Sequence, residues 1–270
     1  MRYFAGIDMG STAIKIALVD ESEELAGHIV APTGSLFQQN TLAALRILLQ
    51  EKGLSRSDVA YILSTGYGRK LFSEADETVS EITANAAGAR TIAGTASIRT
   101  IINIGGQDSK ILLLDGDGHI RNFVMNDKCA AGTGRFLEMT ARNLGTEVDG
   151  LGELHRRCSG APLAITSTCT VFAESEIISL LAKGHQRDEI VAGVHYSIAR
   201  RIVRLARRIG IEDGVFFDGG PALNSGMVAA LEDELLRRVM VPAMPQLTTA
   251  IGAAALARAA WLETGAPINA

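Results

Sequence analysis

Three cysteines among 270 residues are too few for a disulfide framework, so the sequence favours a reducing cytoplasmic environment. No apolar run reaches the roughly 18 residues that a membrane-spanning helix needs, and no signal peptide precedes the strand-like start. The formal net charge is only −4, which gives no electrostatic reason to expect a nucleic-acid partner. Because 47% of the residues are hydrophobic and 21% are charged, we expect a globular protein with neither a membrane nor a nucleic acid as partner.

A weak internal duplication indicates the fold. Residues 3–20 have the pattern of a strand, a Gly/Ser/Thr turn and a second strand, and residues 100–115 repeat it. The run KIALVD in the first copy aligns with KILLLD in the second, and the GDG run at 116–118 predicts a tight hairpin turn. Two copies of this hairpin, each followed by helical segments, predict an α/β protein with two similar lobes.

Patterns in the rest of the chain complete the expected lobes. Helices are predicted over residues 39–52, 80–94, 133–144, 170–183, 187–209, 225–238 and 249–263, and a short strand over 214–220. No proline- or serine-rich linker divides the chain, so the lobe boundary follows from the repeat alone. We expect residues 1–97 to form the N-terminal lobe, with helix 249–263 packed on it. Residues 98–248 would form the C-terminal lobe and carry the cysteines.

The first lobe has a phosphate-binding pattern, DMGST, after its first strand. Gly10 lets backbone N–H groups approach a phosphate, and the hydroxyl groups of Ser11 and Thr12 add donors. Asp8, at the strand end, can hold Mg²⁺ through water, and Lys15 can face phosphate charge. These residues predict one part of a nucleotide site.

The second lobe offers three more glycine turns. In GGQD, Gln107 and Asp108 are suited to orienting water or metal, which makes them candidate catalytic residues together with Asp8. The glycine-turn candidates for phosphate and nucleoside are Gly105, Gly106, Gly132, Thr133, Gly134, Gly219 and Gly220. A single glycine turn is usually only a turn, but four of them at strand ends in a duplicated fold favour a nucleotide site. No GxxxxGK[ST] motif occurs, which excludes a P-loop.

Several of these segments resemble motifs of known families. DMGST, IGGQDSK and DGGPALN are similar to the two phosphate motifs and the adenosine motif of the acetate kinase/sugar kinase/Hsp70/actin superfamily. This resemblance implies two RNase-H-like lobes with ATP in the cleft between them, and it implies nucleotide-binding roles for Asn224 and Gln246. NDKCAAGTGRFLE and STCTVFAESE resemble segments of the ATPase activators of 2-hydroxyacyl-CoA dehydratases and of the related ATPase subunits of benzoyl-CoA reductases.

Two cysteines, Cys129 and Cys169, each stand before a predicted helix. Their spacing alone favours roles as small buried side chains, whereas the family resemblance implies that both bind a cluster. A [4Fe–4S] cluster usually takes four thiolates, so two cysteines from each of two identical chains predict a homodimer with a shared cluster. The helix N-termini would stabilise the thiolates, with Thr170 as N-cap of the second helix. Cys158 is expected not to be a ligand.

The remaining polar residues receive no role in the predicted site. None of the five histidines forms a pair with metal-ligand spacing. Glu174 and Glu176 are expected to be surface acids near the start of the second cysteine helix. The arginines of residues 193–209 are expected to form a solvated basic face.

Together with the resemblance, these features predict a homodimeric ATPase that drives electron transfer. An electron from ferredoxin or flavodoxin would pass to a 2-hydroxyacyl-CoA dehydratase, which would bind the acyl-CoA. One alternative is an ATPase subunit of a benzoyl-CoA reductase, where two related chains could replace the homodimer. Alternatives from other classes are a small-molecule kinase, with Asp108 activating a hydroxyl group, and a nucleotide-dependent binding module without a redox role.

Overall fold

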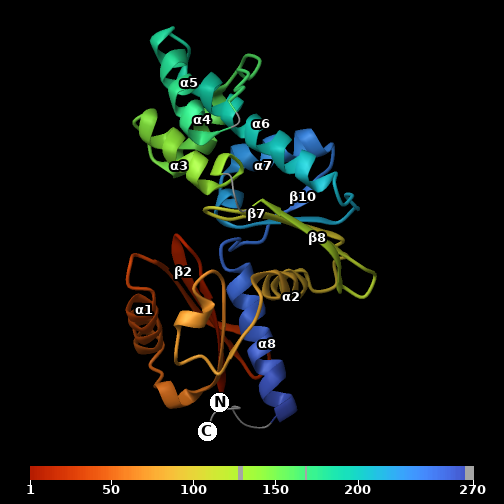
Figure 1. The fold of residues 1–270 in the computed structure, drawn as a ribbon. Helices are drawn as coiled ribbons and strands as arrows, with labels where there is room; N and C mark the ends of the chain where they lie inside the picture. Colours follow the sequence, from red (N-terminus) through yellow and green to blue (C-terminus); the bar gives the residue numbers. More distant parts are fainter. Residues whose placement is uncertain (127–129, 168, 265–270) are drawn as a thin grey trace. The chain divides into compact units, whose positions relative to one another are not determined.

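The computed structural model describes residues 1–126, 130–167 and 169–264. The chain divides into two compact units, one formed by Met1–Ala96 and the residues from Gln246 onward, the other by Ser97–Pro245. Each unit has a five-stranded sheet and its own helices (Figure 1). Within the described ranges, no helix is both long enough and apolar enough to cross a bilayer.

The first unit is built on a sheet with the strand order β3-β2-β1-β4-β5. Its strands are β1 (Tyr3–Met9), β2 (Ala13–Asp20), β3 (Leu25–Pro32), β4 (Val59–Thr65) and β5 (Glu77–Thr78), and its helices are α1 (Phe37–Glu51), α2 (Glu81–Ala93) and α8 (Thr248–Thr264). β2 pairs antiparallel with both β1 and β3, whereas β4 joins β1 in parallel. The β1–β2 turn and the C-terminal end of β4 therefore lie at the same end of the strands.

The last helix of the chain, α8, packs directly on the first strand. At Gly6 of β1, a Cβ atom would lie 2.0 Å from the carbonyl oxygen of Ala250 in α8. α2 meets α8 just as closely at Gly88, where a Cβ atom would lie 1.8 Å from the carbonyl oxygen of Thr248 (Figure 1). Glycine at these two positions lets the three elements pack backbone against backbone.

The second unit repeats the topology of the first. Its strands are β6 (Thr100–Ile104), β7 (Ser109–Leu114), β8 (Ile120–Asn126), β9 (Val215–Asp218) and β10 (Val239–Met240), and its helices are α3 (Gly134–Asn143), α4 (Leu151–Arg157), α5 (Thr170–Ala182), α6 (Arg187–Ala206) and α7 (Ser225–Leu235). The strand order is β10-β9-β6-β7-β8. β7 pairs antiparallel with β6 and β8, and β9 joins β6 in parallel, as β4 joins β1.

The long helix α6 supplies much of the core of the second unit. Val194, Ile198 and Ile202 recur every four residues, are buried, and belong to one apolar cluster with Phe217 of β9. These residues form an apolar stripe along the helix, which ends at Ala206, earlier than the predicted end at residue 209. Ile209 follows the helix and packs against the same cluster.

The predicted duplication of the hairpin is confirmed. In the first copy Asp8 lies opposite Lys15, and in the second Asn103 lies opposite Lys110. The predicted helices also form, with ends that differ by up to three residues. β3, β4 and α4 were not predicted. β4 is almost completely buried and therefore lacks alternating polarity, and α4 is too short to show a clear helical period.

Candidate functional site

The turn between β1 and β2 carries a largely buried ion pair. Lys15 Nζ lies 2.9 Å from Asp8 Oδ2, and Asp8 is only 4% exposed. The second carboxylate oxygen, Asp8 Oδ1, is buried without a hydrogen-bond partner among the described residues, and so is the hydroxyl oxygen of Thr12. Because unpartnered buried oxygens cost free energy, these two atoms suit a bound water or a hard cation such as Mg²⁺.

The loop after β4 closes against the same carboxylate. Gly66 has a φ of +87°, and a Cβ atom there would lie 2.5 Å from Asp8 Oδ1. The N–H of Gly68 donates to the carbonyl of Met9 at 2.9 Å, which holds the loop on the end of β1. Glycine at position 66 thus keeps the space beside Oδ1 open. Gly66 was not predicted to have a role, because β4, the strand that it follows, was not predicted.

Both backbone polar groups of Gly10, in the first predicted phosphate turn, are bonded within the protein. Its N–H donates to the carbonyl of Ala13 at 3.1 Å, and its carbonyl accepts from the Thr33 hydroxyl at 2.7 Å. A Cβ atom on Gly10 would lie 3.0 Å from Lys15 Nζ. The turn is therefore tight, and Ser11, which is partly exposed beside it, is the accessible hydroxyl for a phosphate.

The corresponding turn of the second unit contains a second ion pair. Lys110 Nζ lies 2.8 Å from Asp108 Oδ1, and the Lys110 side chain is 2% exposed. The N–H of Gly105 donates to the carbonyl of Asp108 at 2.9 Å, and a Cβ atom on Gly105 would lie 2.5 Å from Asp108 Oδ1. Gln107 is exposed at this turn. Asp108 is thus fixed by its own loop, and Gln107 is open to solvent.

The third glycine turn packs on the second. The N–H groups of Gly134 and Arg135, at the start of α3, donate to the carbonyls of Gly105 and Gly106 at 2.9 Å and 3.0 Å. The Ser109 hydroxyl donates to the carbonyl of Gly132. The structure therefore brings these two predicted turns together. The N–H groups of Thr133 and Gly134, two of the residues expected to bind an anion at this helix N-terminus, instead donate to the carbonyls of Ala130 and Gly105.

The fourth glycine turn follows β9. Gly219 has a φ of +92°, and a Cβ atom there would lie 2.1 Å from the carbonyl oxygen of Ile104. At Gly220, by contrast, a Cβ atom would meet nothing within 4 Å. Just before this turn the fully buried Asp218 accepts a hydrogen bond from Asn103 Nδ2 at 2.9 Å. The backbone at Gly220 is thus open on the side where a Cβ atom would lie, and its contact with a nucleoside stays a prediction.

Asn224 connects this turn to two histidines. Its Oδ1 accepts from the N–H groups of Gly226 and Met227, which caps α7, and its Nδ2 lies 3.1 Å from His195 Nε2. Since Nδ2 can only donate, His195 Nε2 accepts, and its Nδ1–H donates to His155 Nδ1 at 3.0 Å. Burial lowers the pKa of His195 to about 3. This pair was not predicted, because the two histidines are 40 residues apart in the chain.

Cys169 is exposed and is the N-cap residue of α5. Thr170, which was predicted to cap this helix, is instead its first residue, because the helix begins one residue earlier than that role requires. Cys158 follows α4 directly, and its Sγ lies 3.5 Å from the carbonyl oxygen of Gly160. Cys129 lies outside the described residues.

Glu176 is not the simple surface acid that was predicted. It accepts hydrogen bonds from both the N–H and the hydroxyl group of Thr166 and from the N–H of Ser167. Glu174 accepts one hydrogen bond, from Asn143 Nδ2 at 3.2 Å. Gln246, a further nucleotide candidate, is partly buried and lies with the first unit, two residues before α8.

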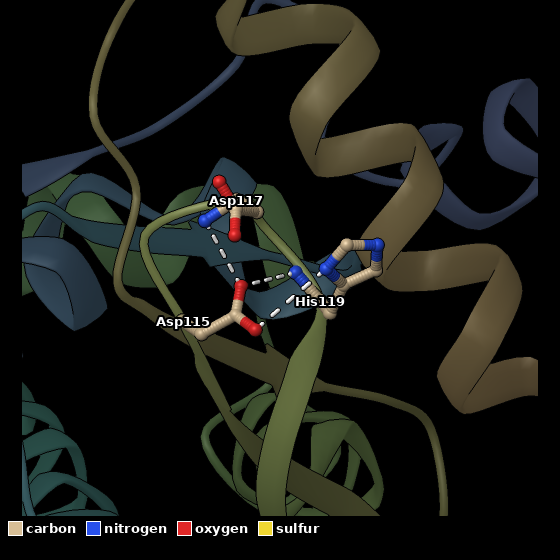
Figure 2. Close-up of side chains that lie close together, drawn as sticks. All are labelled: Asp115, Asp117 and His119. Carbon is tan, nitrogen blue, oxygen red and sulfur yellow. Dashed lines mark hydrogen bonds and ion pairs between the residues drawn. The ribbon is translucent and has the colours of Figure 1, made fainter.

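The β7–β8 hairpin turn gathers Asp115, Asp117 and His119 (Figure 2). Asp115 Oδ1 accepts from the backbone N–H groups of His119 and Asp117 at 2.8 Å and 3.0 Å. These bonds lower the pKa of Asp115, and the bond from the N–H of His119 has the largest effect. They account for the cluster as the stabilisation of a tight turn, which confirms the predicted hairpin.

Comparison with known proteins decides the family. Residues 5–257 match the BadF/BadG/BcrA/BcrD ATPase family. The chain belongs to this family. It is 46% identical over 253 residues to the activator of lactoyl-CoA dehydratase of Anaerotignum propionicum, with 93% of this chain and 96% of that protein covered. It is 31% identical over 245 residues to a benzoyl-CoA reductase subunit of Thauera aromatica, with coverages of 89% and 86%.

The fold agrees with this assignment. The structure of the activator of the 2-hydroxyisocaproyl-CoA dehydratase from Clostridium difficile with bound ADPNP matches with a TM-score of 0.92. The two chains are 42% identical, and the match covers 97% of each. The predicted family and the predicted α/β fold of two actin- and sugar-kinase-type lobes are therefore confirmed, and the family is one of ATPases.

Proposed function

We propose that the chain is a cytoplasmic, ATP-hydrolysing activator that delivers electrons to a 2-hydroxyacyl-CoA dehydratase. The observation that carries the proposal is the exposed Cys169 at the N-terminus of α5, in a chain whose family is one of ATPases. A thiol in this position is available to a metal cluster, and the partial positive charge of the helix N-terminus favours a bound anionic group. The full-length similarity to dehydratase activators supports the choice of acceptor.

The proposed nucleotide-binding residues come from both units. In the first unit, Ser11, Thr12 and Lys15 would bind phosphate, and the buried Oδ1 of Asp8 fits Mg²⁺ or a water molecule bound to it. In the second unit, Gln107 and Asp108 would orient water, and the open backbone at Gly220 would lie against the nucleoside. The bound ADPNP of the structural relative supports a nucleotide ligand.

A [4Fe–4S] cluster shared by two identical chains is the proposed electron carrier, with Cys129 and Cys169 of each chain as ligands. When bound, the cluster supplies the capacity to accept and release one electron. The described part of this site fits the proposal, because the Cys169 thiol is exposed beside an apolar helix turn. Val171 and Phe172 are 68% and 70% exposed, which is what a surface covered by a second chain would show.

The electron would come from ferredoxin or flavodoxin, and the acyl-CoA would bind the dehydratase. ATP can change the cluster surroundings only if it binds two conformations of the chain with different affinities. The second candidate is an ATPase subunit of a benzoyl-CoA reductase. It is favoured only by the 31% identity to the Thauera aromatica reductase chain, against 46% for the lactoyl-CoA dehydratase activator. A small-molecule kinase would leave the exposed Cys169 unexplained.

Anaerobic purification followed by iron and sulfide analysis and EPR spectroscopy of the reduced protein tests the proposal. We expect the spectrum of a reduced [4Fe–4S] cluster in the wild type, its loss in Cys169→Ser, and its retention in Cys158→Ser, the matched control. ATP-analogue binding should survive both substitutions. An iron-free wild type with unimpaired ATP hydrolysis would contradict the electron-transfer function.

A further inference from the structure

The segment just before Cys169 is bound to the helix that follows it. Glu176 Oε1 accepts from the Thr166 N–H at 3.0 Å and from the Thr166 hydroxyl at 2.9 Å. Glu176 Oε2 accepts from the Ser167 N–H at 2.9 Å. Both oxygens of one carboxylate on the second turn of α5 therefore hold the chain two and three residues ahead of the cysteine.

A second helix holds the same segment from its other side. Arg201 of α6 donates through its guanidinium to the carbonyl of Ser167. The guanidinium also lies over the ring of Phe136 in α3, 5.9 Å from the centroid. The N–H of Ser167 is thus bound by an acid of α5, and its carbonyl by a base of α6. Both backbone polar groups of Ser167 therefore have a side-chain partner.

Glu176 is suited to this task because it remains ionised. Partial burial raises its pKa, but the hydrogen bonds from Ser167 and Thr166 outweigh burial and hold the pKa below its ordinary value. Hydrogen bonds to an ionised carboxylate are stronger than those to a neutral group. The segment is therefore fixed more firmly than a surface loop usually is.

We propose that Glu176 and Arg201 are positioning residues that set the orientation of the Cys169 side chain at the N-terminus of α5. Helix α5 fixes the chain after the cysteine, where the Ala173 N–H donates to the Cys169 carbonyl at 2.9 Å. Glu176 and Arg201 hold Ser167, two residues before the cysteine. Cluster ligands need such support because small displacements weaken metal binding. The proposal rests on the proposed function, since it assumes that Cys169 is a ligand.

The neighbouring residues of the same two helices provide matched controls. Glu174 lies two residues from Glu176 on α5 but accepts from Asn143 of α3, and it makes no hydrogen bond to Thr166 or Ser167 among the described residues. Arg200 precedes Arg201 on α6 but pairs with Glu234 of α7, with Nε 2.8 Å from Oε1. Glu174→Gln and Arg200→Gln therefore change the same charges on the same helices without touching Thr166 or Ser167.

Hydrogen exchange of the cluster-free protein tests the contacts themselves. We expect the amide N–H groups of Thr166 and Ser167 to exchange about tenfold faster in Glu176→Gln than in Glu174→Gln, because bonds to an ionised acceptor are lost. Thermal unfolding of the four variants checks that each still folds. Equal exchange rates in the Glu176 and Glu174 variants would overturn the proposal.

The loaded, anaerobically purified protein tests the role of the contacts. Iron release to a chelator should be roughly tenfold faster in Glu176→Gln and Arg201→Gln than in their controls, with a changed EPR spectrum of the reduced cluster. A purely structural role would lower the unfolding midpoint but leave the spectrum unchanged, and that result would overturn the proposal. A wild type without a cluster would instead contradict the proposed function. The hydrogen-exchange rates of the cluster-free protein would still test whether Glu176 holds Thr166 and Ser167.

Discussion

The two units share one topology but differ at the same edge of their sheets. In the first, Asp8 lies opposite Lys15 and forms the ion pair across the hairpin. In the second, Asn103 takes the place of the aspartate, and Lys110 pairs with Asp108 of the turn. Each unit then has a glycine with positive φ directly after its parallel strand, Gly66 in the first and Gly219 in the second, against the end of the central strand.

The two units differ in whether the acid at this end of the sheet has an oxygen left for a ligand. The carboxylate of Asp8 has an oxygen without a partner among the described residues, whereas Asp218, the acid at the second edge, is bonded to Asn103. An unpartnered buried oxygen needs a ligand, and a partnered one does not. The duplicated frame thus supplies the same strand pairing twice, and the described carboxylate oxygen without a partner belongs to the first copy.

The largest expected effect comes from removing the charge of Asp8. Asp8→Asn should lower ATP hydrolysis by about 100-fold, because the metal loses its anionic partner while the amide can still contact Lys15. The control is Asp20→Asn, which changes a partly exposed acid at the end of β2 in the same unit, where it accepts from the N–H of Ser22. Steady-state hydrolysis at saturating Mg²⁺ measures both. Comparable activity in the two variants would remove the distinction between the units.

Alanine at the two equivalent glycines should separate stability from activity. Gly219→Ala forces a Cβ atom onto a backbone carbonyl and should cost roughly 3 kcal/mol or more of unfolding free energy. Gly66→Ala places its Cβ atom 2.5 Å from Asp8 Oδ1 and 2.9 Å from the carbonyl group of Met9, which is less severe than the 2.1 Å approach at Gly219. It should cost about 1–3 kcal/mol, but should lower ATP hydrolysis out of proportion. Gly53→Ala, with φ of +66° and open space around it, measures the backbone strain alone. Denaturant unfolding should show the larger loss of stability in Gly219→Ala, whereas ATPase assays should show a loss of activity in Gly66→Ala that exceeds its loss of stability.

Acid should destabilise the second unit first. His195 stays neutral in the folded chain down to a pKa of about 3, but in the unfolded chain it binds a proton near pH 6.5. The unfolded state therefore binds more protons between these values, so stability falls as the pH drops from about 6.5 toward 3. In the first unit, His28 is exposed and has no such burial. Hydrogen exchange across this range should show loss of protection in α6 and α7 before β1 and β2.

The matching variant sharpens this prediction. His195→Gln keeps a side chain that can accept from Asn224 but does not titrate. The slope of unfolding free energy against pH should then decrease by up to about one proton. An unchanged slope would show that His195 is not the group responsible.

The smallest effect is expected at the β7–β8 turn. Asp115→Asn loses part of the contacts to the N–H groups of Asp117 and His119, all in an exposed turn (Figure 2). We expect a small fall in the unfolding midpoint and ATP hydrolysis within about twofold of wild type. A Mg²⁺-dependent loss of activity would show that this acidic turn is more than a hairpin.

Much of the fold could be predicted because its signals are local. The KIALVD and KILLLD runs revealed the duplicated hairpin, and periodic apolar residues located α1, α2 and α6. β4 was not predicted, because a strand buried on both faces shows no alternation of polar and apolar residues. Without β4, the equivalence of Gly66 and Gly219 could not be recognised. Recognising that equivalence requires the strand pairing of Asp8 with Thr65 and of Asn103 with Asp218.

The polar contacts of the site were less accessible from sequence. Motif patterns indicated Asp8, Lys15 and Cys169, but not which atoms would lack partners. The contacts of His155 with His195, and of Glu176 with Thr166, depend on how helices pack. Nothing in the spacing of such residues distinguishes them from solvated side chains, so Glu176 was expected at the surface.

Native mass spectrometry of the anaerobically purified protein tests the central claim most directly, because it measures assembly and cluster content together. We predict one [4Fe–4S] cluster on two identical chains, and loss of the cluster mass in Cys169→Ser. A wild-type assembly that hydrolyses ATP but carries no iron and sulfide mass would contradict the account.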